Sequence, residues 1–279
     1  MQLPAKRGKL AVEIPPGMED VFDVKDNMEG IVPRLPQIAI IHAGQLFEMP
    51  DETKVETFEG IILDHNPANA YWAKDIKERD AKAKEPPDCS SLDGVIPVEN
   101  CKDKQAEFCK DCPQNEWGSD PKGGKGKACK NMHRLMILMQ DSVLPKRLSL
   151  APSSLGKDKA LFPDFMTRLY DQGLPCAAVV VDFSLLKVEN PDGFEYSKVT
   201  FAKNRVMESE ELVTIGNMIK QYKAGAREQE IQADEYAAKE TESEVDESEA
   251  ESEVETNGGP EKKSWFGKSK AVDDGDIPF

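Results

Sequence analysis

The sequence predicts a mainly β fold of the α+β class with a few short helices, and three observations lead to this expectation. Several runs alternate apolar and polar residues with a period of two, as half-buried strands do. Five of the six cysteines fall between Cys89 and Cys129, which is typical of an inserted metal-binding segment. Residues 226–279 are acidic and too poor in apolar side chains to offset the entropy of ordering them.

Composition divides the chain into three parts. Residues 1–35 are rich in Pro, Gly and charge without a steady period, which indicates an N-terminal arm. Residues 36–225 carry the strand and helix patterns and form the predicted folded domain, with the cysteine-rich insertion at about 86–134. Residues 226–279 form the predicted disordered acidic tail.

Strand patterns begin at residue 37 and continue through 55–65. In the second run, Ile61 and Leu63 share one face while Phe58 and Ile62 share the other. Asn66 and Pro67 then predict a turn. The runs 134–139 and 145–152 read as strands that return to the core, and two alternating runs on either side of residues 189–193 predict a β-hairpin.

Two helices are predicted. Residues 162–173 have Pro163 near the start and Gly173 as a C-terminal stop, with Phe165, Leu169 and Tyr170 expected on one side. The second helix begins with Ser209 as its cap, and the folded part of the chain is expected to end near Gly225. Its expected buried stripe is made of Leu212, Ile215, Ile219 and Tyr222.

The cysteine spacing indicates a zinc site. Cys109 and Cys112 form a Cys-x-x-Cys pair, the tight turn that lets two thiolates meet one tetrahedral metal, and Cys129 follows downstream. Cys89 and Cys101 are both candidates for the fourth ligand, and His133 is a reserve ligand. The alternative is that these are ordinary free cysteines, although the segment is polar and offers little to bury them as apolar side chains.

The negative charge of the chain is unevenly distributed. The formal net charge is -16, of which residues 226–279 contribute -11 (seventeen acidic and six basic residues), leaving -5 for the rest. Residues 122–147 form a local basic patch, with Asp141 as its acid. The bases of this patch are Lys122, Lys125, Lys127, Lys130, Arg134, Lys146 and Arg147.

Aromatic residues beside these bases suggest contacts to single-stranded nucleic acid, on which bases stack. Trp117 lies between the Cys-x-x-Cys pair and the lysine-glycine loop, where it either stacks on a base or packs under the metal site. The other aromatic candidates likewise have two interpretations, as platforms on which bases stack or as part of the core. The candidate DNA contacts are Tyr71, Trp72, Trp117, Lys122, Lys125, Lys127, Lys130, Arg134, Phe194, Tyr196 and Lys198.

The last residues of the chain carry a resemblance to a known family. Residues 273–279, DDGDIPF, resemble the acidic, phenylalanine-ended tip of bacterial single-stranded DNA-binding proteins. In that family the tip recruits replication, repair and recombination enzymes. The residues expected to do so here are Asp273, Asp274, Asp276, Ile277, Pro278 and Phe279. A merely solubilising acidic tail would need neither the terminal phenylalanine nor this order of residues.

A second resemblance covers residues 89–134, where CSSLDG, the Cys-x-x-Cys pair, NEWGS, GKGKACK and HRL look like a group of zinc-containing phage and mobile-element proteins. The strand-rich remainder is similar in plan to phage single-stranded DNA-binding proteins that insert a zinc subdomain into an OB barrel. The resemblance implies an OB-like barrel and a protein that coats DNA in bacteriophage replication, recombination and repair. It also favours Cys89 as the fourth ligand of one Zn²⁺ per chain, because Cys89 belongs to CSSLDG.

Other functions were weighed on the same residues. GSDPKGGKGKA fails as a phosphate loop, because Ala128 stands where Ser or Thr should bind magnesium. We expect no enzyme, although a metal-dependent nuclease is a minor alternative. The stronger alternative is a zinc-bearing adaptor that engages host enzymes through its tip without binding DNA. The chain has no long apolar run or signal-peptide core, so we expect a protein of the bacterial cytoplasm.

Overall fold

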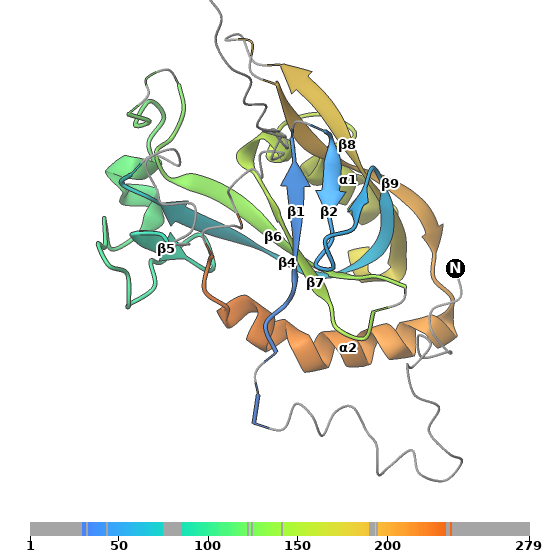
Figure 1. Ribbon diagram of the computed structural model, residues 1–279. Coiled ribbons are helices and arrows are strands. Elements are labelled where there is room, and N and C mark those ends of the chain that lie inside the picture. Colours follow the sequence, from blue (N-terminus) through green and yellow to red (C-terminus); the bar gives the residue numbers. More distant parts are fainter. Residues whose placement is uncertain are drawn as a thin grey trace, which may run out of the picture. The chain divides into compact units, whose positions relative to one another are not determined.

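The computed structural model describes residues 30–235, except 32, 43, 75–84, 122, 124, 141, 190–192, 194 and 233–234. In this part the chain is mainly β, with two α-helices and short 3₁₀ turns (Figure 1), as the sequence predicts. The strands are β1 (Gln37–Ile41), β2 (Leu46–Glu48), β3 (Lys54–Val55), β4 (Phe58–Tyr71), β5 (Cys89–Ser91), β6 (Lys130–Leu138), β7 (Lys146–Leu150), β8 (Val179–Glu189) and β9 (Glu195–Val206). The 3₁₀ turns are η2 (Cys109–Asp111), η3 (Pro113–Asn115), η4 (Pro152–Leu155) and η5 (Cys176–Ala178).

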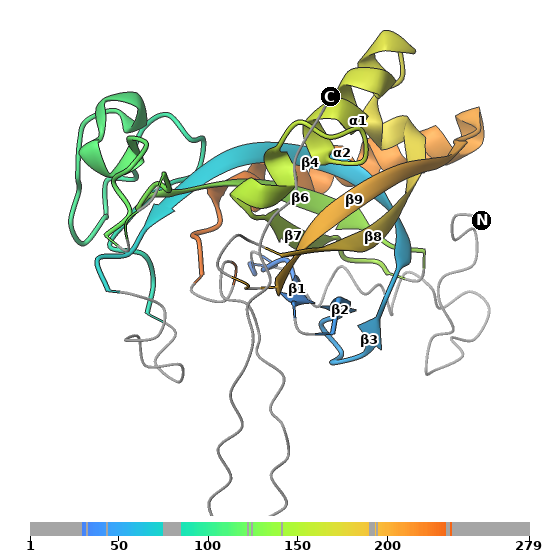
Figure 2. The same cartoon turned by 90° about the horizontal axis from the view of Figure 1, so that it is seen from above.

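The strands form one sheet in the order β3-β2-β1-β7-β6-β4-β8-β9, with β5 added to the end of β4. β1 and β7 pair in parallel, and the other pairs are antiparallel. The predicted hairpin is confirmed, since β8 and β9 pair along their lengths from Val179 opposite Val206 to Glu189 opposite Glu195. Figure 2 shows β4 bending along the sheet and reaching the cysteine-rich segment.

The predicted turn at Asn66 and Pro67 is wrong, because β4 runs straight through both residues and Pro67 lies opposite His133 of β6. Proline lacks the N–H that a central strand donates. It is tolerated here because the β8 ladder on the other edge of β4 ends at Ile61, while β5 begins to pair only at Asn69. As a result, β4 is one long strand that extends from the core of the sheet to the cysteine-rich segment.

The two faces of the sheet bury separate apolar clusters. Phe58 and Ile62 belong to one cluster, which α1 (Phe162–Asp171) covers, whereas Ile61 and Leu63 belong to the other, against which α2 (Ser209–Glu228) packs. The alternation predicted for β4 is therefore confirmed. In the first cluster the rings of Phe58 and Phe183 stack with centroids 4.6 Å apart.

The helix α1 begins and ends as the sequence predicts. Pro163 lies in its first turn, and Gly173 after its end adopts a φ of 67°, which glycine tolerates without a Cβ clash. Phe165 and Leu169 are buried. Tyr170, expected beside them, is instead 87% exposed, because the residue after Leu169 is turned by a further 100° or so around the helix.

The helix α2 begins one residue earlier than predicted and runs to Glu228, past the predicted end of the folded domain near Gly225. Glu208, rather than Ser209, is the N-cap, and it forms a reciprocal capping box with Glu211. Of the predicted stripe, Ile215 is buried and Ile219 and Tyr222 pack against the second cluster, while Leu212 is 38% exposed.

The chain remains packed beyond the predicted end of the folded domain near Gly225. Ile231 is buried against Trp72, Ala68 and Met132, and Glu235 is buried as well. We call residues 229–235 the strap. Among the described residues, no helix is long and apolar enough to cross a membrane.

Candidate nucleic-acid interface

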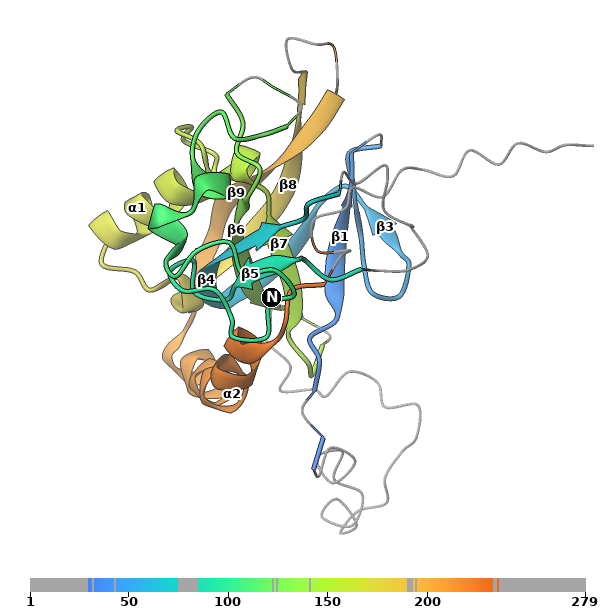
Figure 3. The ribbon, with the colours of Figure 1, turned by 90° about the vertical axis from the view of Figure 1, so that its left-hand side faces the viewer.

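The four cysteines predicted as metal ligands line one cavity. They come from β5, from η2, from the residue between η2 and η3, and from the residue before β6, in the segment that Figure 3 presents to the viewer around β5. The cavity has a volume of about 10 Å³, which is room for about one water-sized species. The four side chains at its wall are Cys89, Cys109, Cys112 and Cys129.

Backbone hydrogen bonds fold the segment around this cavity. The N–H of Cys109 donates to the carbonyl of Val95 at 2.9 Å, and the N–H of Cys129 donates to Gln114 at 2.7 Å. The side-chain amide of Asn115 donates to the carbonyl of Cys109 at 2.8 Å. These bonds bring together thiols that are forty residues apart in the chain.

Thiol sulfur is the donor type that a soft divalent cation prefers, but burial favours the protonated form of two of these thiols, so a cation would have to displace their protons. Burial, with smaller contributions from the neighbouring thiols of Cys112 and Cys109, raises the pKa of Cys129 to about 12. Burial likewise raises the pKa of Cys89 to about 11. In the described part of the chain, no three His, Cys, Asp or Glu side chains are already arranged to hold a metal. The thiols thus line one cavity, but their sulfur atoms are not yet directed at one metal position. Rotation about the Cα–Cβ bonds changes the direction of a cysteine sulfur.

Neither the other candidate for the fourth ligand, Cys101, nor the reserve ligand, His133, lines the cavity. The sulfur of Cys101 is 3.8 Å from that of Cys89 and also contacts the backbone of Ser90, but Cys101 is not among the cavity-lining residues. His133 points to His65, with Nε2 and Nδ1 2.8 Å apart, and its ring packs on Phe162.

Trp117 is exposed rather than packed under the cysteines. Its side chain is 79% accessible to solvent, and the Nζ of Lys127 lies over the indole at 5.1 Å from the ring centroid. The same Nζ donates to the side-chain oxygen of Asn115 at 3.1 Å. Because Asn115 also binds the carbonyl of Cys109, it positions the lysine relative to the cysteines.

The lysine-glycine loop folds back on the residues that follow Trp117. The N–H groups of Gly118 and Asp120 both donate to the carbonyl of Gly126, at 2.9 and 3.2 Å. Gly118 has a φ of 88°, a conformation that favours glycine. Lys125 is exposed, and Lys122 lies outside the described residues.

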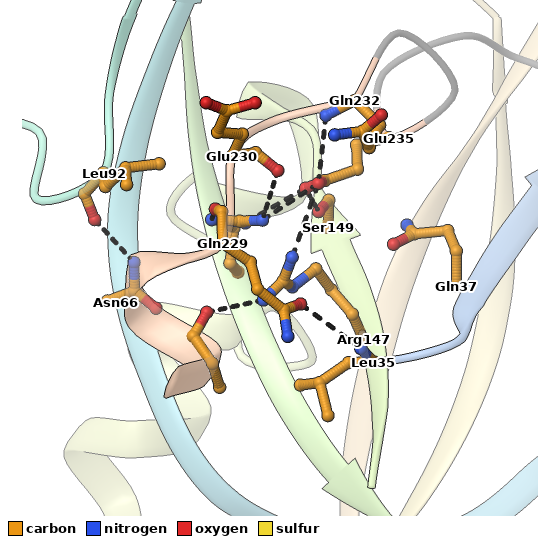
Figure 4. A network of polar contacts seen from close by, with 12 residues as sticks. Leu35, Gln37, Asn66, Leu92, Arg147, Ser149, Gln229, Glu230, Gln232 and Glu235 are labelled. Carbon is orange, nitrogen blue, oxygen red and sulfur yellow. Dashed lines mark hydrogen bonds and ion pairs between the residues drawn. The ribbon is translucent and has the colours of Figure 1, made fainter. Parts of the chain in front are cut away.

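Part of the predicted basic patch is neutralised. The Nζ of Lys130 lies 3.0 Å from a carboxylate oxygen of Asp120. Arg134 was expected to contact phosphate, yet its side chain is 2% exposed and pairs with Glu235. Arg147 is also buried, and Figure 4 shows it with Ser149, Glu235 and the strap residues on this face of the sheet. Arg134 therefore belongs to the interior rather than to the DNA-contacting surface.

The remaining aromatic candidates divide in the same way. Trp72 is buried with Ala68, Met132 and Ile231, so it serves the core, while Tyr71 is half-buried at the wall of the cysteine cavity. Tyr196 is half-buried, with the Nζ of Lys198 over its ring at 5.9 Å. Phe194 lies outside the described residues, as does the whole predicted tip: Asp273, Asp274, Asp276, Ile277, Pro278 and Phe279.

Three residues of this region were not singled out from the sequence. Asn115 stands two residues before Trp117, Phe108 directly precedes the Cys-x-x-Cys pair, and Glu235 lies in the acidic stretch. An aromatic residue beside paired cysteines is a signal that could have identified Phe108. Neither Asn115 nor Glu235 carries such a signal, because their roles depend on partners distant in sequence.

Comparisons with known protein families, with curated proteins and with solved structures find no match to this chain.

Proposed function

We propose that this protein binds single-stranded DNA through the surface around Trp117 and recruits replication, repair and recombination enzymes through its C-terminal tip. The observation that carries the proposal is the exposure of Trp117, 79%, together with the Lys127 ammonium 5.1 Å from its ring centroid. A large apolar side chain left in solvent marks an interaction surface more often than a part of the core.

The chemistry of the pair suits a nucleotide. An indole face stacks on any base, which contributes about 1–3 kcal/mol per base, and a neighbouring ammonium neutralises the phosphate that follows. Lys125, two residues before Lys127 in the chain, is exposed, and the glycines of the loop allow close approach of the backbone. Tyr196 and Lys198 offer a second ring with an ammonium on it. A surface of this kind binds single strands of any nucleotide sequence, as a protein that coats single-stranded DNA must.

We further propose one Zn²⁺ per chain, held by Cys89, Cys109, Cys112 and Cys129. Four buried thiols on one small cavity support this ligand set, because thiolates are the ligands that structural zinc sites favour. The metal supplies charge neutralisation for the thiolates and a rigid cross-link between distant parts of the segment. The segment then holds Asn115, and through it Lys127, in the position described above.

The finer architecture and the biological setting belong to the same proposal. An OB-like barrel in a protein of bacteriophage or mobile-element replication agrees with the mainly β sheet. The acidic residues 236–272 link this domain to the tip. A tethered tip stays at high effective concentration near its own domain, and it can reach an enzyme bound elsewhere on the same DNA.

The test is a pair of matched aromatic variants. Trp117→Ala and Tyr170→Ala each remove one exposed ring, but Tyr170 lies on α1 and has 87% of its side chain in solvent. We expect Trp117→Ala to weaken binding of fluorescent oligothymidine about fivefold or more, and Tyr170→Ala to leave it unchanged. Equal affinity in both variants and in the parent protein would show that Trp117 does not contact DNA. That result would favour the alternative function, a zinc-bearing adaptor that does not bind DNA.

A further inference from the structure

Phe108 forms a further ring with a lysine over it, beside Cys109 of the Cys-x-x-Cys pair. Its side chain is 45% exposed, and the Nζ of Lys110 lies 5.7 Å from the centroid of its ring. The two residues flank Cys109, whose own side chain is buried in the cavity wall. The backbone therefore turns the thiol inward and the aromatic ring outward at consecutive positions.

The charge of Lys110 is uncompensated within the described part of the chain. Other lysines of the same segment have carboxylate partners: Lys102 with Asp88 at 3.2 Å, Lys104 with Glu107 at 2.9 Å, and Lys130 with Asp120 at 3.0 Å. Lys110 and Lys127 instead lie over aromatic rings. A ring face with an ammonium that no carboxylate neutralises offers stacking and a phosphate contact at one place.

Asn115 links the Phe108–Lys110 pair with the Trp117–Lys127 pair. Its amide nitrogen donates to the carbonyl of Cys109, the residue after Phe108, at 2.8 Å, and its amide oxygen accepts from Lys127 at 3.1 Å. Phe108 directly precedes η2, and Trp117 follows the end of η3 by two residues. The hydrogen bonds of Asn115 therefore connect the segment next to Phe108 with the lysine that lies over Trp117.

We propose that Phe108 and Lys110 form a second base-stacking position for the same single strand, with a nucleobase on the ring and a backbone phosphate at Lys110. This inference rests on the proposed function and extends its surface from Trp117 to Phe108. Val95 and Ile96, 55% and 50% exposed, continue the apolar surface, since the carbonyl of Val95 accepts the N–H of Cys109. The uncompensated ammonium favours an anionic polymer as the occupant over an apolar peptide.

The experiment measures oligothymidine binding by anisotropy for Phe108→Ala and Lys110→Ala, with Tyr170→Ala and Lys104→Ala as matched controls. Phe108→Ala should weaken binding about fivefold or more, and Phe108→Tyr should restore it because the ring is kept. Lys110→Ala should reduce the salt dependence of binding, whereas Lys104→Ala, whose lysine is paired with Glu107, should change it less. Metal content measured for every variant separates loss of a contact from unfolding of the segment.

A second readout does not depend on the variants. In the parent protein, photocrosslinking with oligothymidine that carries 5-iododeoxyuridine should attach DNA to the peptide containing Phe108 as well as to the one containing Trp117. Parent-like affinity in Phe108→Ala and no crosslink at Phe108 would overturn this inference while leaving binding at Trp117 intact. Loss of enzyme recruitment without loss of DNA affinity in Phe108→Ala would also overturn it, and would make the surface a protein contact. Absence of any oligothymidine binding by the parent protein would instead contradict the proposed function itself.

Discussion

Arg134 and Glu235, 101 residues apart in the chain, form a two-point ion pair in the interior of the protein. Nε and Nη2 of Arg134 donate to the two carboxylate oxygens of Glu235 at 3.0 and 2.9 Å, and each side chain is 2% exposed. Ser149 donates to the same carboxylate at 2.9 Å, and Arg147 lies 3.5 Å from it. Glu235 is therefore part of the folded domain, which reaches beyond the predicted end near Gly225.

Glu235→Gln should destabilise the protein by about 3–5 kcal/mol, because removing one partner of a buried ion pair leaves a buried charge without compensation. Here the uncompensated charges are the guanidinium groups of Arg134 and Arg147. Glu230→Gln is the matched control, since Glu230 lies in the same strap but is exposed. Urea unfolding measures both, and indistinguishable midpoints for the two variants would show that the Glu235 carboxylate contributes nothing to stability.

Cys89→Ser should lower the zinc content of the purified protein, because three thiolates and a hydroxyl hold the metal more weakly than four thiolates. Cys101→Ser and Cys176→Ser are the controls, and both should keep one zinc per chain since neither residue lines the cavity. Elemental analysis of the three variants decides the ligand set. Full occupancy in Cys89→Ser would remove Cys89 from it.

The His65 and His133 pair predicts a loss of stability in mild acid. Burial lowers the pKa of His133 to about 4, with a further contribution from His65, and burial is also the main cause that lowers the pKa of His65. The folded protein therefore binds fewer protons than the unfolded chain, whose histidines titrate near 6.5. The free energy of unfolding should rise with pH between about 4 and 6.5 and should stop changing through this pair above that range.

The measurement is urea unfolding at several pH values for the parent protein and for His133→Gln, in which the residue no longer titrates. The change of the unfolding midpoint between pH 4 and 6.5 should be smaller in the variant. The same pH dependence in both proteins would mean that carboxylates, rather than this histidine, account for it.

Deleting residues 273–279 should leave folding intact, raise DNA affinity modestly at low salt, and abolish recruitment of replication or repair enzymes. The physical reason is that a tethered acidic tip competes with DNA for the basic surface, while its terminal Phe279 provides the apolar anchor for a partner. Phe279→Ala alone should abolish recruitment with little effect on DNA. Pull-down of single-strand-processing enzymes by the two variants tests this, and continued capture by Phe279→Ala would rule out the tip as their binding site.

The sequence predicted those parts of the fold that depend on local pattern. Alternation placed Ile61 and Ile62 on opposite faces of β4, and the turn composition after Glu189 predicted the hairpin of β8 and β9. The local pattern gave a wrong prediction at Pro67, where a turn was expected. A proline fits in a strand whose edge is unpaired, and the edge is unpaired here because the neighbouring strand β8 ends its pairing at Ile61.

The site was predictable to a similar degree. Cysteine spacing brought Cys109, Cys112 and Cys129 together, since a Cys-x-x-Cys turn is a local structure, but it left Cys89 and Cys101 open, and only the resemblance of CSSLDG favoured Cys89, which lines the cavity. Charge alone did not distinguish a surface lysine from a buried arginine. Arg134 counts as a base of the patch in the sequence, yet Glu235 pairs with it from a stretch that composition assigns to the tail.

The central claim, that the surface around Trp117 and Lys127 binds single strands, is tested most directly by anisotropy with fluorescent oligothymidine and a duplex of equal length at two salt concentrations. We expect the single strand to bind more tightly, with affinity falling at a log–log slope of about -0.7 per phosphate neutralised. Lys125→Ala with Lys127→Ala should flatten that slope more than Lys130→Ala, because Asp120 neutralises Lys130. Binding that does not discriminate between single strand and duplex, or no binding at low salt, would contradict the account.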